Sequence, residues 1–187
     1  MKTIKEKTYK FEDLSKEAKE NAIKWYQENN SLDYDWWSQV YDDAHEIGLE
    51  IKSFELDRDS NITGDFTTNI EHVIKLIYKN HGRKCETYKL AQSWKKKLNV
   101  LAVTYKLMSK KECVACGNDA ERWDVNQYGY CHTDCFEGEI EHEFKEQLLK
   151  CYLVSLESDY DYLQSDESAI ESIQANDYDF DQDGNRA

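Results

Sequence analysis

Apolar residues along this chain follow the two spacings that distinguish helices from strands. In five long segments they recur every three or four positions, which places them on one face of an α-helix. The predicted helices cover residues 15–29, 32–47, 68–80, 85–110 and 137–156, and a shorter helix follows Ser165. Helices therefore make up most of the predicted structure.

Other segments alternate between polar and apolar residues, the pattern of a strand with one buried face. Residues 49–56 show it most clearly, and residues 62–66 are expected to return beside them as a hairpin. Residues 3–11 predict a short edge strand, and residues 177–180 a final strand. The fold class predicted is α+β: mostly helical, with a small antiparallel sheet and an inserted structural zinc knuckle.

The helix ends carry their own signals. Ser15 and Ser165 are predicted N-caps, because a hydroxyl there accepts a hydrogen bond from a free backbone N–H group. The pair Thr68 and Glu71 has the spacing of a capping box for the third helix. Gly48 is expected to end the second helix.

Three regions are predicted from these elements. Residues 1–111 form an α+β core, residues 112–136 form the zinc knuckle, and residues 137–187 form a long helix and an acidic segment that packs back on the core. The chain has 187 residues, of which 13% are aromatic, so it is expected to fold. The absence of proline suits a mainly helical chain.

The start of the chain has no apolar run like that of a signal peptide. No window approaches the roughly 18 apolar residues of a membrane span. We therefore expect a cytoplasmic protein with no membrane association. Cysteines that cluster in a reducing compartment indicate a metal site.

Four of the six cysteines fall within residues 113–135. Cys113-Val-Ala-Cys116-Gly117 forms a turn in which two thiolates reach one ion. Cys135 is the third predicted ligand, and the fourth is either Cys131 or His132. The two-residue gap favours His132, whereas Cys131 gives four thiolates. Four protein ligands close the site, so the predicted zinc ion is structural.

The zinc segment resembles a treble-clef knuckle and the first half of a LIM module, in which Cys-x-x-Cys precedes His-x-x-Cys-Phe. The resemblance covers residues 113–136 only, and no second LIM half follows. It implies metal binding and nothing about partners. Cys85 and Cys151 stand outside the cluster and are expected to be small buried residues.

Charge is distributed unevenly. The net charge is −14, yet residues 83–111 hold nine basic side chains and one acidic side chain. This basic stripe, with Lys95, Lys96 and Lys97 at its centre, has two interpretations. It either neutralises acidic neighbours on the surface or contacts nucleic acid or an acidic partner.

Residues 157–187 hold ten acidic side chains and one basic side chain. Either they are a solvated surface, or they form an interface that imitates the phosphate charge of nucleic acid. Tyrosines that alternate with carboxylates favour an interface. The candidate partner-binding residues are Asp159, Tyr160, Asp161, Tyr162, Asp177 and Tyr178.

No catalytic motif is present, so an enzyme is not expected. Asp179-x-Asp181-x-Asp183-Gly184 begins like a calcium-binding EF-hand loop, but the sequence ends before the glutamate that such a loop needs at its twelfth position. The segment is therefore interpreted as a polar turn.

Several blocks together are similar to a family of uncharacterised phage and prophage proteins, some of them described as antitoxins. They include residues 14–25, 36–41, 47–49, 53–58 and 165–170. The resemblance implies a phage-encoded inhibitor in the host cytoplasm that binds a bacterial toxin or defence protein directly. The alternative is a nucleic-acid-associated regulator that uses the zinc knuckle and the basic stripe.

Overall fold

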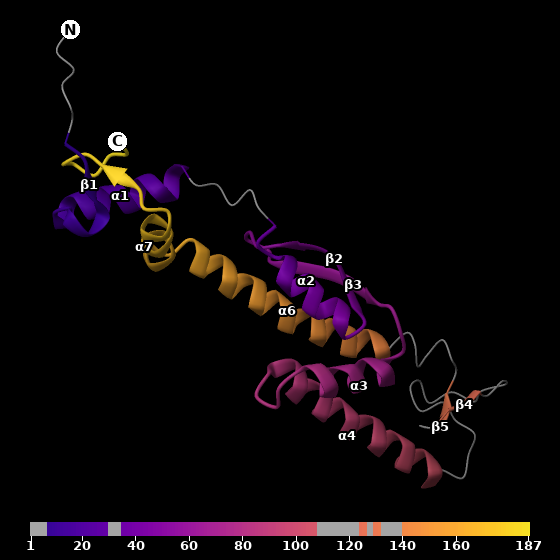
Figure 1. Ribbon diagram of the computed structural model, residues 1–187. Helices are drawn as coiled ribbons and strands as arrows, with labels where there is room; N and C mark the ends of the chain where they lie inside the picture. The colour runs from indigo at the N-terminus through magenta and orange to yellow at the C-terminus, as the bar shows by residue number, and fades with distance from the viewer. Residues whose placement is uncertain (1–6, 30–34, 108–123, 127–128, 132–139) are drawn as a thin grey trace. The chain divides into compact units, whose positions relative to one another are not determined.

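The protein is mostly helical with small antiparallel sheets, which confirms the predicted α+β class (Figure 1). The computed structural model describes residues 7–29, 35–107, 124–126, 129–131 and 140–187. The α-helices are α1 (Lys16–Asn29), α2 (Ser38–Glu46), α3 (Ile70–Asn80), α4 (Glu86–Leu107), α6 (Glu141–Leu163) and α7 (Asp166–Ala175), and a 3-10 turn, η1, spans Phe11–Asp13.

The described strands form three two-stranded antiparallel sheets. They are β1 (Tyr9–Lys10) with β6 (Asp179–Phe180), β2 (Leu49–Glu55) with β3 (Asn61–Phe66), and β4 (Asp124–Asn126) with β5 (Gly129–Cys131). The predicted hairpin is confirmed as β2–β3. The pairing of β1 with β6 joins segments near the two ends of the sequence, which no local pattern predicts (Figure 1).

The chain divides into two compact units. One combines residues 1–36 with residues 156–187, and the other spans residues 37–155, so the division falls within α6. We call them the terminal unit and the hairpin unit. The predicted boundaries near residues 111 and 136 lie outside the described residues, so that three-part division stays a prediction.

The hairpin unit has a core built from one face of each of its helices. Ile70, Val73, Ile74 and Ile77 of α3 are all nearly inaccessible to solvent, at the spacing that the sequence predicts. Phe144 of α6 is fully buried, and its ring lies 5.4 Å from that of Trp94 and 5.7 Å from that of Phe66. The other buried residues of the hairpin unit's core are Ala44, Ile47, Leu49, Ile51, Ala91, Leu98, Ile140, Leu148, Leu149 and Tyr152.

The terminal unit has a separate small core. It contains Phe11, Leu14, Ala18, Ala22, Ile173 and Phe180. Alanines on α1 let neighbouring backbone approach closely, and Gly184 uses this space. A Cβ atom at Gly184 would lie 2.0 Å from the carbonyl oxygen of Ala18, and its φ is +87°. Only glycine fits this position without displacing the backbone.

Three of the four helix-end signals predicted from the sequence are confirmed, those of Ser15, Ser165 and Gly48. The hydroxyls of Ser15 and Ser165 each accept a hydrogen bond, at 3.2 Å, from the backbone N–H three residues later. Gly48 follows α2 with a φ of +81°. The predicted capping box is wrong by one residue. Asn69, not Thr68, caps α3, because its side-chain oxygen accepts from the N–H of His72 at 3.0 Å.

Two helices differ in length from the prediction. The second begins at Ser38 rather than near residue 32, since Trp36 and Trp37 lie in a turn. The long helix α6 continues to Leu163, beyond the predicted end at residue 156. Its extension carries the alternating tyrosines and aspartates at 159–162, whose mixed composition hides the helical repeat.

Candidate functional site

The predicted zinc ligands Cys113, Cys116, His132 and Cys135 lie outside the described residues. Cys131 ends β5, and its backbone pairs with that of Asp124. The hairpin β4–β5 thus follows Cys116 in the chain and ends at the candidate ligand Cys131. Within the described ranges, no three His, Cys, Asp or Glu side chains come together as ligands for one ion. The structural zinc ion stays a prediction.

The predicted basic stripe contains lysines with different surroundings. Lys97 forms an ion pair with Glu143 at 2.6 Å, and its ammonium nitrogen lies 4.1 Å from the ring centre of Trp94. Lys97 therefore helps to join α4 to α6. Lys95 is half-buried and Lys96 is exposed, and neither forms an ion pair with a described residue. One of the three central lysines of the stripe, Lys97, thus makes contacts within the protein.

Two of the predicted partner-binding residues, Asp177 and Tyr178, make contacts within the terminal unit. Lys10 contacts the carboxylates of Asp177 and Asp179 at 2.9 and 3.0 Å, and the hydrogen bonds that it donates, first that to Asp177, raise the pKa of Lys10. The ring of Tyr178 packs edge-on against Trp25, and the Arg186 guanidinium lies 3.9 Å from its centre. Asp177 and Tyr178 are therefore engaged within the chain.

The other four predicted residues lie on the last turns of α6. Tyr160 is half-buried, and its ring lies 5.8 Å from that of Trp36. Asp159, Asp161 and Tyr162 are exposed. The Tyr162 hydroxyl donates to the Glu171 carboxylate at 2.7 Å, which ties the end of α6 to α7. Three of the four side chains thus face solvent on a fixed backbone.

The exposed carboxylates at the C-terminal end of α6 and on α7 form what we call the acidic segment: Asp159, Asp161, Asp166, Glu167 and Glu171. None forms an ion pair with a described Lys, Arg or His side chain. Residues 159–171 contain no basic residue at all. Asp166 and Glu167 occupy the first turn of α7, where the helix dipole favours negative charge.

The helix dipole acts in the opposite direction on Asp159 and Asp161. Both lie near the C-terminus of α6, where negative charge is unfavourable, and no basic residue lies in the last turn. Aspartate is also a weaker helix former than lysine or glutamate. Their charges are therefore kept at a cost to the stability of the helix.

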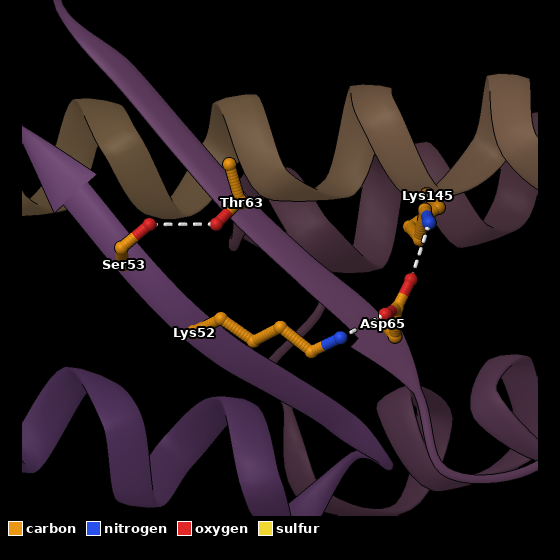
Figure 2. A network of polar contacts seen from close by, with 5 residues as sticks. All are labelled: Lys52, Ser53, Thr63, Asp65 and Lys145. Atoms are coloured by element: carbon orange, nitrogen blue, oxygen red, sulfur yellow. Dashed lines mark hydrogen bonds and ion pairs between the residues drawn. The ribbon is translucent and has the colours of Figure 1, made fainter.

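The hairpin carries a polar network that the sequence does not reveal (Figure 2). Asp65 of β3 accepts hydrogen bonds from Lys145 of α6, at 2.7 Å, and from Lys52 of β2. These two bonds, that from Lys145 first, lower the pKa of Asp65 to about 2. Beside them the Ser53 and Thr63 hydroxyls are hydrogen-bonded across the strands at 2.7 Å. The network fixes α6 on the hairpin.

A second polar chain crosses the hairpin unit between α2, α4 and α6. The Nδ1 atom of His81 is hydrogen-bonded to the Thr87 hydroxyl at 2.6 Å, and Nε2 lies 3.4 Å from Oδ2 of Asp43. The Tyr152 hydroxyl donates to the same Oδ2 at 2.8 Å, and burial raises the pKa of this phenol. These residues are distant in sequence, so no motif could identify them.

The two cysteines outside the predicted zinc cluster, Cys85 and Cys151, lie near the polar residues Asp43, His81, Thr87 and Tyr152. Cys85 is exposed, so its predicted burial is wrong. It lies in the exposed turn that precedes the first residue of α4. Cys151 of α6 is half-buried, and burial raises the pKa of its thiol. Both thiols are free.

The EF-hand-like segment is a polar turn, as interpreted from the sequence. The Asp181 carboxylate accepts hydrogen bonds from the backbone N–H groups of Asp183 and Asn185, at 2.9 and 2.8 Å. The Asn185 side chain donates to its other oxygen at 3.0 Å. These bonds, those from Asn185 first, lower the pKa of Asp181.

Comparison of the chain with protein-family models, with curated proteins and with solved structures finds no match. Among the described residues, no helix combines the length and the apolar character required to cross a bilayer.

Proposed function

We propose that this protein is an inhibitor or antitoxin-like protein that neutralises another protein by direct binding through its acidic segment. The observation that carries the proposal is the placement of Asp159 and Asp161. Both are exposed near the C-terminus of α6, without a cationic partner among the described residues, where their charge destabilises the helix. Side chains kept at such a cost point to a role outside the fold.

The character of the segment defines the surface that it would bind. The five carboxylates are exposed, and so is the ring of Tyr162, at 45%. Such a surface complements a basic patch on a partner, and charge complementarity steers association and fixes the register of the two proteins. A protein that normally contacts nucleic acid presents such a patch. Imitation of phosphate charge is thus part of the proposal.

A phage origin, a host cytoplasmic location and a toxin or defence protein as partner rest on the resemblance of the sequence to the phage family. The alternative of a nucleic-acid-associated regulator has weaker support, because Lys97 is engaged with Glu143 and Trp94. Lys95 and Lys96 would then carry the contact with nucleic acid, and binding would fall steeply with salt.

The test is an affinity capture from nuclease-treated bacterial lysate with the double variant D159K/D161K. The control variant D57K/D59K makes the same change of charge at two exposed positions in the turn of the β2–β3 hairpin. We expect one stoichiometric host protein with the wild-type chain and the control, and its loss with D159K/D161K. Equal retention by both variants would contradict the proposal.

If capture from untreated lysate yields only nucleic-acid-associated proteins, and nuclease treatment abolishes it, the regulator is favoured instead. Changing Lys95 and Lys96 to Glu should then weaken retention.

A further inference from the structure

The hairpin unit contains a cavity of about 630 Å³ beside the polar chain of His81 and Asp43. This volume lies within the range of small-molecule sites in proteins. Its walls come from α2, the turn between α3 and α4, and the middle of α6. The lining includes Asp43, His81, Cys85, Thr87, Cys151 and Val154.

The Asp43 carboxylate is the principal charged group at this cavity. It is held in place by the Tyr152 hydroxyl at 2.8 Å, and its side chain is 52% exposed. No described Lys or Arg lies within ion-pair distance of it. Glu86 and Lys150 also line the cavity with opposite charges, so Asp43 gives the cavity a net negative charge when His81 is neutral.

His81 supplies a second polar group at this cavity. Its side chain is only 7% exposed, and its Nε2 atom lies 3.4 Å from Oδ2 of Asp43 without a well-formed hydrogen bond to any described residue. Thr87 engages the other ring nitrogen, Nδ1. A buried polar atom without a partner is unfavourable, and native structures contain few of them. A donor group beside these two atoms would reach both the Asp43 carboxylate and Nε2, in the His81 tautomer that carries its proton on Nδ1.

The rest of the cavity is apolar in character. Val154 is 63% exposed, an unusual state for a large aliphatic side chain that lies in a cavity wall. The Cys85 and Cys151 side chains extend the same wall. The described donor groups do not bring three metal ligands to one point. An organic cation therefore suits this cavity better than a metal ion.

We propose that this cavity binds a small primary amine with an apolar body. The ammonium group would lie on Asp43 and, after a small turn of that exposed side chain, would also donate to Nε2 of His81. The apolar body would cover Val154 and the two cysteines. An ammonium carries three donors, so one group can serve both acceptors. This inference is independent of the acidic segment.

The test is a two-dimensional NMR titration of the full chain with benzylamine, and with benzyl alcohol as the neutral analogue. The variant D43N keeps an oxygen that can accept from Tyr152 but removes the charge. The matched control is D42N, a change at the neighbouring exposed residue of α2, which does not line the cavity. Folding of each variant is checked from its unliganded spectrum.

We expect saturable shifts of the Cys85, Cys151 and Val154 amides with benzylamine. Binding should be at least about tenfold weaker for benzyl alcohol and for D43N, because a charge-assisted hydrogen bond is lost, and unchanged for D42N. Equal binding of amine and alcohol would overturn the proposal. So would unsaturable shifts, or shifts confined to other residues.

Discussion

Replacing Gly184 with alanine should detach the C-terminal turn from α1. The new Cβ atom would lie 2.0 Å from the Ala18 carbonyl oxygen and 2.8 Å from its carbon, closer than any atoms pack. The φ of +87° adds strain for any residue with a Cβ, of about 1–3 kcal/mol. Since the backbone must also separate from α1, we expect local opening of the terminal unit to become easier by at least about 2 kcal/mol.

Hydrogen exchange read by mass spectrometry measures this opening directly. Exchange in α1 and in residues 166–187 should accelerate by about thirtyfold or more, whereas the β2–β3 hairpin should be unaffected. The control is Gly82→Ala, because a Cβ there meets only Cys85 Sγ at 3.9 Å, an ordinary contact. Unchanged exchange in the Gly184→Ala variant would refute the packing of the C-terminus on α1.

Two further predictions concern the hairpin unit. The pKa of Asp65 is lowered to about 2 from 3.8, so its bonds stabilise the fold above pH 3.8 and this contribution is lost as the pH falls toward 2. Carboxyl NMR should show this midpoint near 2, and Lys145→Met should move it toward 3.8; a wild-type midpoint at 3.8 would disprove the network. Phe144→Ala should lower the free energy of unfolding in urea by about 3–5 kcal/mol, because removing the ring leaves a cavity between Trp94 and Phe66. A loss below about 1 kcal/mol would contradict the central position of Phe144.

The sequence predicts those parts of the fold that depend on local patterns. The face of α3, the caps Ser15 and Ser165 and the β2–β3 hairpin follow from spacing and side-chain chemistry within a few residues. The wrong N-cap predicted for α3, Thr68 in place of Asn69, also comes from relying on a local pattern. Several residues in 67–69 can cap a helix, and only the backbone geometry selects one.

Long-range pairing could not be predicted in this way. The β1–β6 sheet and the contact of Gly184 with Ala18 join residues more than 160 positions apart, so no periodicity records them. For the same reason, no local pattern predicts the contacts of Asp177 with Lys10 and of Tyr178 with Trp25. Charge composition identifies the acidic segment, but only the structure shows which of its carboxylates have partners.

The most direct test of the proposed function compares binding and stability in the same variant. We would measure the affinity of D159K/D161K for the captured host protein by calorimetry, and its free energy of unfolding in urea. The account predicts an affinity at least about tenfold weaker, with stability unchanged or raised by roughly 1 kcal/mol, because lysine suits the C-terminus of α6. An unchanged affinity, with D57K/D59K equally unaffected, would contradict the claim that the acidic segment binds the partner.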